Sequence, residues 1–260
     1  MILEQFGIGM VTGLYGISGI PNAIIVDSRQ VFDAIKRGAE KITTSREGST
    51  GFRSMAVRQG DVDIVVVQAP SYPPAIVEVV SELYVFGVRN IVSISRGYKF
   101  SKRVPPSGVL VAVGAIPRDS LSVSIAGSGV PLLASQKLAS AYRSIVELRF
   151  SDFDWIYGFT VTVESPMLRW CTQPLRDLAG KRGVYAVDSL TAALYAAQYE
   201  FQNLETLSLL TLRRNLQLMG GPIASSSEYS EIEEREAREE AILYMTAVEL
   251  FKALSRTSMK

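Results

Sequence analysis

The chain has 260 residues, of which 47% are hydrophobic and 20% are charged, and its formal net charge is +1. This length and apolar content fit one large globular domain with a substantial buried core, and they exclude a disordered chain. The nearly neutral charge argues against a general nucleic-acid or membrane-surface binder, since such a protein needs a dense basic face.

The residue types that are missing exclude several kinds of chemistry. The sequence has no histidine and one cysteine, Cys171, which we interpret as a small buried hydrophobe. This excludes Ser-His-Asp and Cys-His catalysis, His-ligated zinc, intrachain disulfides and cysteine-rich metal sites, so no metal is expected. The N-terminus shows no signal-peptide pattern, and the longest apolar runs are too short to span a membrane. We therefore expect a cytoplasmic protein.

Extended apolar segments alternate with helical patterns along the chain. The first half is predicted to contain a strand at 22–27, a helix from Asp27 through 29–38, a hairpin at 52–68, a helix from Pro73, and strands at 90–95 and 108–116. The hairpin turns at Gln59-Gly60-Asp61, and the segment 45–53 before it is interpreted as a loop. The second half is predicted to contain a helix at 134–150, a strand at 155–163, a strand-to-helix turn at 183–197 and a strand at 205–212.

The C-terminal segment has the pattern of a helix that follows a loop at 220–227. Ser230 and Glu233 form a capping box at its start. The stretch EIEEREAREE (231–240) is interpreted as a solvated helix face and not as a metal site. The predicted apolar face consists of Ala237, Ala241, Tyr244, Val248 and Phe251.

This alternation of strands and helices predicts an α/β fold with a largely buried mixed sheet. The sequence shows no internal repeat and no linker, so residues 1–260 are expected to form a single domain. In such sheets, ligands bind beyond the carboxyl ends of the strands.

Three stretches together resemble one enzyme family. They are AIVEVVSELYVFGVRNIVSIS (75–95), GVLVAVGAIPRDS (108–120) and AVDSLTAALYA (186–196). Their order and spacing are similar to those of the nucleoside phosphorylases, the family of uridine phosphorylases and hexameric purine nucleoside phosphorylases, and the resemblance is clearest over 22–217. It implies a three-layer α/β/α fold with a central mixed, partly barrel-like sheet, to which 228–255 adds a C-terminal helix.

The resemblance implies reversible phosphorolysis of a nucleoside to a free base and ribose 1-phosphate, with phosphate as co-substrate and no cofactor. Catalysis of this kind depends on positioning and charge stabilisation: arginines and amides for phosphate, a carboxylate for the ribose hydroxyls, and donors for the departing base. The expected partners are a nucleoside and phosphate, with no nucleic acid and no membrane.

The phosphate-binding residues implied by the resemblance are only partly retained. Arg46 matches the arginine that reaches into a neighbouring subunit's site, and Ser71 remains from a Gly-Gly-Pro-Ser loop. Arg29 follows the position of the family's Gly-Asp-Pro motif and is a further candidate, although an exposed arginine at a helix start is the favoured interpretation. The family's phosphate arginine is Ser93 here, while Arg96 takes the place of a threonine and is the candidate replacement.

The nucleoside-binding residues implied by the resemblance are also altered. Arg214, beside Arg213, matches the arginine of the uridine branch, where a cation stabilises negative charge on uracil; a surface strand end is the alternative reading. Further base contacts would come from Glu164 and Met167, and ribose contacts from Asp188 and Ser189. The family's ribose-binding glutamate is Leu190, which shares helical spacing with Ala193, Leu194 and Ala197, and capping of the helix is the favoured role of Asp188.

Three functions remain open. The first is an active phosphorylase, with uridine favoured as substrate. The second is a catalytically degenerate relative that binds a ligand or serves as a subunit partner. The third is a nucleosidase, whose carboxylate base would have to be Glu164 or Asp188. The resemblance also implies a homo-oligomer, a dimer or hexamer, or a hetero-oligomer with a related chain.

Overall fold

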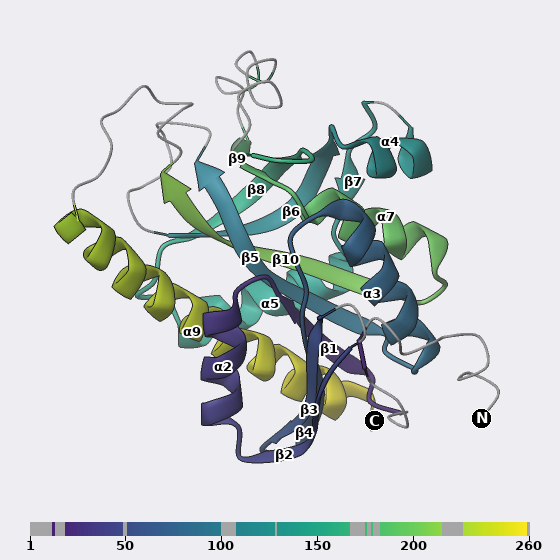
Figure 1. Ribbon diagram of the computed structural model, residues 1–260, viewed down its shortest axis with the longest axis vertical. Coiled ribbons are helices and arrows are strands. Elements are labelled where there is room, and N and C mark those ends of the chain that lie inside the picture. The colour runs from purple at the N-terminus through teal and green to yellow at the C-terminus, as the bar shows by residue number, and fades with distance from the viewer. Residues whose placement is uncertain are drawn as a thin grey trace.

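The computed structural model describes residues 12–13, 19–48, 51–99, 108–127, 129–166, 175, 178, 183–214 and 226–258 (Figure 1). Its strands are β1 (Asn22–Val26), β2 (Lys41–Glu47), β3 (Arg53–Gln59), β4 (Val62–Gln68), β5 (Asn90–Lys99), β6 (Val109–Pro117), β7 (Leu132–Leu133), β8 (Trp155–Thr162), β9 (Val184–Asp188) and β10 (Glu205–Arg214). Its helices are α2 (Arg29–Gly38), α3 (Pro73–Val85), α4 (Ser120–Ala126), α5 (Gln136–Arg149), α7 (Thr191–Glu200) and α9 (Ser226–Ser258).

All of these strands belong to one mixed sheet that is partly closed into a barrel. Strands β10, β6, β8, β9 and β5 follow one another around the barrel, and pairing of β10 with β5 closes it. Strands β1, β4, β3 and β2 extend the sheet from β5, so that β2 is an edge. Strands β1, β5 and β10 run parallel, and their carboxyl ends therefore lie at the same end of the sheet. This confirms the predicted α/β fold with a mixed, partly barrel-like sheet.

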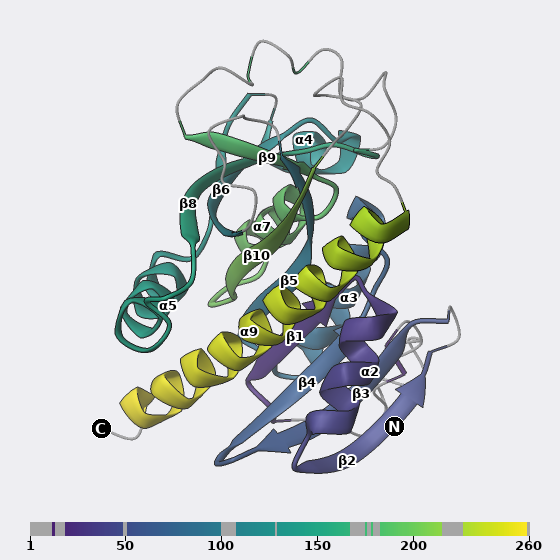
Figure 2. The ribbon, with the colours of Figure 1, turned by 90° about the vertical axis from the view of Figure 1, so that its left-hand side faces the viewer.

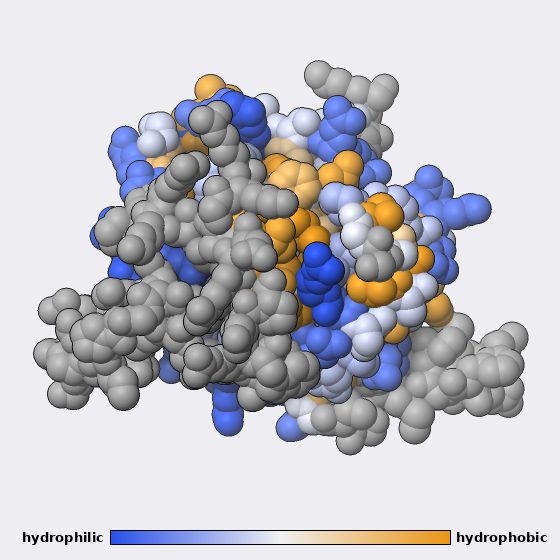
Figure 3. Space-filling model, turned by 90° about the horizontal axis from the view of Figure 1, so that it is seen from above, coloured by the Kyte–Doolittle hydropathy of each residue, from blue (hydrophilic) through white to orange (hydrophobic). Residues whose placement is uncertain are grey.

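Two hydrophobic clusters cover the two faces of the sheet. Successive strand residues point to opposite faces, so Ile25 joins the cluster under α3 and α7, while Ile24 joins the cluster under α2, α5 and α9. Helix α9 lies along the second face beside α2 and α5 (Figure 2). Figure 3 views the molecule from the end toward which β5 and β10 run, where hydrophobic residues lie near the centre. The three-layer arrangement follows from these two buried faces.

Most elements lie where the sequence pattern places them. The hairpin β3–β4 turns at Gly60, whose φ of 65° is the left-handed conformation that glycine adopts without strain. Helix α3 buries the predicted positions Ile76, Val79, Val80 and Leu83. Its prolines lie in the first turn, where their missing N–H groups cost little.

Three predictions about boundaries are wrong. Residues 45–47 belong to strand β2 and not to a loop, because they pair with β3. Strand β5 continues four residues beyond 95, since β10 pairs with it as far as Lys99. Helix α9 begins at Ser226, so Ser230 lies inside the helix and cannot be its cap.

Cys171 lies outside the described residues. Within the described ranges, no helix is long and apolar enough to cross a membrane.

Candidate functional site

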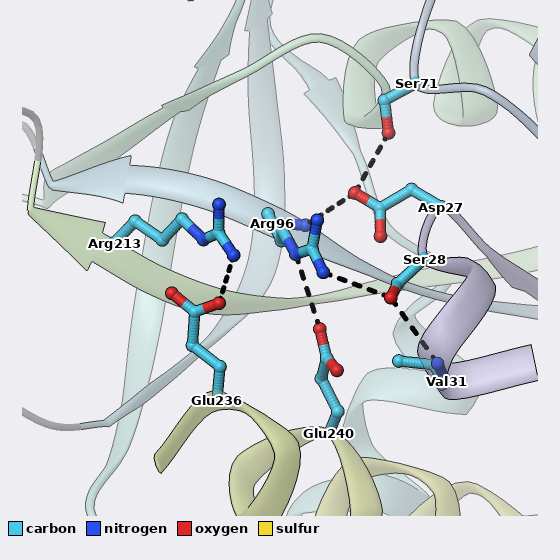
Figure 4. Close-up of polar contacts among 8 residues, drawn as sticks. All are labelled: Asp27, Ser28, Val31, Ser71, Arg96, Arg213, Glu236 and Glu240. Carbon is cyan, nitrogen blue, oxygen red and sulfur yellow. Dashed lines mark hydrogen bonds and ion pairs between the residues drawn. The ribbon is translucent and has the colours of Figure 1, made fainter. Parts of the chain in front are cut away.

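A pocket lies where β1, β5 and β10 end beneath helix α9. Its volume is about 450 Å³, within the range of roughly 300 to 1,000 Å³ that is usual for small-molecule sites. Its charged lining residues are Asp27, Arg29, Arg96, Arg213, Glu236 and Glu240. Figure 4 shows Asp27, Arg96 and Arg213 at the strand ends and Glu236 and Glu240 on the N-terminal half of α9. Arg29 is the first residue of α2. This is the end of an open α/β sheet at which ligands bind.

The turn from β1 into α2 positions the first two polar groups. Ser28 is the N-cap of α2, and its hydroxyl accepts a hydrogen bond from the Val31 amide at 3.4 Å. Asp27 accepts hydrogen bonds at Oδ2 from the Arg96 amide, at 3.1 Å, and from the Ser71 hydroxyl, at 3.2 Å. Burial raises the pKa of Asp27, and the nearby Arg96 opposes that rise.

Two arginines from the neighbouring strands β5 and β10 form the cationic wall. Arg96 donates from Nη2 to the Ser28 hydroxyl at 3.0 Å, and its Nε lies 3.5 Å from a Glu240 oxygen. Arg213 forms an ion pair with Glu236. Both arginine side chains are about one-third exposed, at 27% and 31%, whereas the two glutamates are only 7% and 4% exposed.

The acidic part of α9 differs from its predicted role. Glu236, Glu239 and Glu240 are buried whereas Glu234, Ala237 and Arg238 are exposed, so the stretch 234–240 is solvated only in part. Of the predicted apolar face, Val248 and Phe251 are buried and Tyr244 packs against the core, but Ala237 and Ala241 are exposed. Glu236 and Glu240 are buried in that first part of the helix because the arginines of the sheet offer them charged partners. Hydrophobic periodicity carries no signal for such pairing, so these residues were missed.

Glu240 is a second acid in the pocket whose pKa is raised by burial. Burial raises its pKa from the ordinary value of 4.5 to about 7, while Arg96 opposes the shift and Asp27 and Glu236 add to it. The folded chain therefore binds more protons than the unfolded chain between these two values, so this residue's contribution makes stability fall as pH rises through that window.

We expect Glu240→Gln to stabilise the protein by about 1 to 3 kcal/mol at pH 8 and to change little at pH 4.5. The variant should show a flatter decline in stability between these pH values, measured by denaturant unfolding. Glu147→Gln is the control, because Glu147 is 58% exposed and its ion pair within the described chain is with the exposed Arg143. A wild-type pH profile retained in Glu240→Gln would contradict the assignment.

Arg96 does not occupy the place of the missing phosphate arginine. Ser93 lies beside Ile25 in the sheet, on the face covered by α3 and α7. Arg96 is three residues further along β5, so it projects from the opposite face, where it meets α9. Arg96 and Ser93 therefore lie on opposite faces of the sheet, and Arg96 lines a pocket together with Arg29.

The residues predicted to bind ribose, Asp188 and Ser189, lie at the start of helix α7. Asp188 is buried and accepts hydrogen bonds from the Thr162 and Thr191 hydroxyls and from the amides of Leu190 and Thr191. Burial raises its pKa, and these donors oppose the rise. Ser189 donates to the Ser71 carbonyl at 2.7 Å. Leu190 is 1% exposed and belongs to the core cluster under α3 and α7, as its spacing predicted.

The remaining predicted site residues lie away from this pocket or cannot be placed. Arg46 is exposed on the edge strand β2. Glu164 is exposed and accepts a hydrogen bond from the Ser120 amide at the start of α4. Arg214 ends β10 opposite Lys99, while its side chain and all of Met167 lie outside the described residues. Among the described residues, no group of three or more Cys, Asp or Glu is placed to hold a metal ion.

Comparisons with known proteins identify the fold. No protein-family model and no curated protein matches the sequence. Among solved structures, uridine phosphorylase from Vibrio fischeri ES114, in complex with 6-hydroxy-1-naphthoic acid, matches with a TM-score of 0.77, 18% identity and coverage of 90% of this chain and 91% of that chain. Purine nucleoside phosphorylase from Toxoplasma gondii, in complex with immucillin-H, matches with a TM-score of 0.74, 17% identity and coverage of 91% and 93%. The chain therefore has the nucleoside phosphorylase fold.

Proposed function

We propose that this chain is a nucleoside phosphorylase-like ligand-binding protein, and that the pocket between β1, β5, β10 and α9 binds a small anion or an anion-bearing ligand. The observation that carries the proposal is the meeting of two arginines, Arg96 and Arg213, in a pocket of about 450 Å³ at the carboxyl ends of parallel strands. Guanidinium groups suit phosphate and carboxylate ligands because they offer several donors in a planar fork.

The residues at the positions that the resemblance assigns to ribose binding favour ligand binding over phosphorolysis. Leu190 is in the core at the position that the resemblance assigns to the ribose carboxylate. Asp188, the nearest acid in sequence, already accepts four hydrogen bonds from its own helix entrance and from Thr162. Without a carboxylate for the ribose hydroxyls, a main source of transition-state positioning is lost.

The test combines binding with turnover. Purified protein is titrated with phosphate by calorimetry, and then incubated with uridine, inosine or methylthioadenosine, with and without phosphate, while base release is followed. We expect phosphate binding that Arg96→Gln abolishes and Arg58→Gln leaves intact, because Arg58 forms an exposed pair with Asp63 on the β3–β4 hairpin. Base release that requires phosphate would overturn the proposal and identify an active phosphorylase.

A nucleosidase is the second candidate, and Glu240 favours it. A carboxyl group whose pKa is near 7 can accept a proton from water at neutral pH, and Glu240 lines the pocket. Base release without phosphate, lost in Glu240→Gln, would support this function in place of simple binding. The acids named from the sequence, Glu164 and Asp188, fit that role less well because both are engaged at helix starts.

The preference for uridine stays a proposal that depends on Arg214. If Arg214 provides the cation for the base, Arg214→Ala should weaken uridine binding about tenfold, the equivalent of roughly 1.4 kcal/mol, and leave phosphate binding unchanged. Titration of both ligands into the variant measures this. Equal uridine affinity in the variant and the wild type would reject the assignment and leave Arg214 as the end of a surface strand.

Assembly is also a proposal, and the position of Arg46 supports it. Arg46 is exposed on β2, whose outer edge is unpaired in the described chain. A cytoplasmic homo-oligomer would place this arginine in a neighbour's site. Light scattering should then show a dimer or hexamer, and Arg46→Ala should weaken phosphate binding without changing the mass. A monomer would reject the role of Arg46.

A further inference from the structure

The contacts between α9 and the two arginines leave much of their hydrogen-bonding capacity unused. Arg96 and Glu240 meet through Nε at 3.5 Å, which is longer than a good hydrogen bond. Arg213 meets Glu236 through Nη2. The Nε atoms of both arginines are buried and have no hydrogen-bond partner within the described chain. An anion bound bidentately would use two donors of a guanidinium, so these pairs are weaker than the arginines allow.

The carboxylates are incompletely satisfied as well. Oε1 of Glu236 and Oδ1 of Asp27 are buried and lack hydrogen-bond partners in the described part of the protein. A buried polar atom without a partner costs about 1 to 3 kcal/mol. Figure 4 therefore shows arginines and carboxylates in contact, but both the arginines and the carboxylates still have buried polar atoms without hydrogen-bond partners in the described chain. An anion that makes more hydrogen bonds to these arginines could therefore replace the carboxylates as their partner.

We propose that Glu236 and Glu240 are built-in competitors, which occupy Arg96 and Arg213 in the resting protein and must be displaced before an oxyanion binds there. The inference rests on the proposed anion-binding function and adds its regulation. The two glutamates are one helical turn apart on α9, so they face the two arginines together. An oxyanion entering the pocket would exchange two single-contact pairs for bidentate contacts with the same guanidinium groups.

This competition gives anion binding a defined dependence on pH. The charged groups that act on Glu240 are Asp27 after β1, Arg96 from β5, Arg213 from β10 and Glu236 from α9, and Arg29 from α2 also lines the pocket. The two acids raise its pKa and the arginines Arg96 and Arg213 lower it, but burial dominates and the value is about 7. Below that pH, Glu240 is neutral and releases Arg96. Binding should therefore tighten as pH falls.

Sulfate is the probe, because it keeps two negative charges throughout this range, whereas phosphate itself titrates. If binding requires neutral Glu240, sulfate should bind about tenfold more tightly at pH 6 than at pH 8, because the competent fraction falls about tenfold. Calorimetry on the full chain at both pH values measures this. In Glu236→Gln/Glu240→Gln, affinity at pH 8 should rise at least to the wild-type value at pH 6, and the dependence on pH should disappear.

Glu239→Gln is the matched control. Glu239 is a buried acid of the same helix, but it accepts a hydrogen bond from the Gly108 amide and lies outside the pocket lining. It should keep the wild-type affinities. Circular dichroism verifies that each variant is folded. Equal sulfate binding in wild type and double variant, at both pH values, would overturn the competition and leave the binding function standing. No binding of sulfate or phosphate by any folded form would reject both.

Discussion

Asp188→Ala is expected to lower the free energy of unfolding by about 3 to 5 kcal/mol, because it removes the acceptor for four buried donors at once. The donors are the Thr162 hydroxyl at 2.7 Å, the amides of Leu190 and Thr191 at 3.2 and 3.3 Å, and the Thr191 hydroxyl. These groups belong to β8 and to the start of α7, which are packed against the core and cannot turn toward water. Urea unfolding at neutral pH measures the loss.

The control for this prediction is Asp63→Ala. Asp63 is 39% exposed, and its pair with Arg58 on the β3–β4 hairpin should contribute no more than about 1 kcal/mol. Thr191→Val adds a second check, since it removes one donor to Asp188 and the contact with the Ser208 hydroxyl at 2.9 Å, and it should cost less than Asp188→Ala. A loss below 1 kcal/mol in Asp188→Ala would show that Asp188 is not needed for the helix entrance and would reopen a ligand-binding role.

The fold could be predicted from the sequence because its signals are local. Apolar runs such as those of β1 and β5, the Gly60 turn and the helical spacing of α3 each depend on neighbours in the chain. Edge strand β2 could not be predicted, because its seven residues are exposed or half-buried and show no apolar run. Residues 41–47 form a strand because they pair with β3. This pairing depends on the tertiary structure and not on the local sequence pattern.

The candidate site was predicted only in part, because its residues are brought together over long separations. Arg96 and Arg29 were identified as candidate anion ligands and do meet in one pocket. Glu236 and Glu240 were assigned to solvent, because a run of charges in a helix is usually exposed and only the distant arginines reverse that expectation. The opposite directions of Ser93 and Arg96 follow from strand periodicity, a signal that was present in the sequence. The contacts of Asp188 with Leu190 and Thr191 agree with the predicted role at the helix start, whereas its bond with Thr162, 26 residues away, left no signal in the sequence.

Arg213→Ala is expected to destabilise the protein by about 3 to 5 kcal/mol at pH 8, because it leaves the Glu236 carboxylate buried and without its partner. Glu236 is 4% exposed and Arg213 31% exposed, so water compensates the lost ion pair poorly. Urea unfolding at pH 8 measures the loss.

Two further variants separate the ion pair from the arginine's packing. Arg143→Ala removes an arginine of an exposed pair with Glu147, at 2.7 Å, and should cost at most about 1 kcal/mol. Arg213→Ala/Glu236→Leu removes both charges and should recover most of the loss, since a buried pair replaced by apolar residues is often neutral or stabilising. If the double variant were as unstable as Arg213→Ala, packing of the arginine stem would be the cause. Recovery would instead mean that burying the Glu236 carboxylate costs free energy, and that the ion pair with Arg213 offsets this cost. A ligand that binds Arg213 could then displace Glu236 from the pocket.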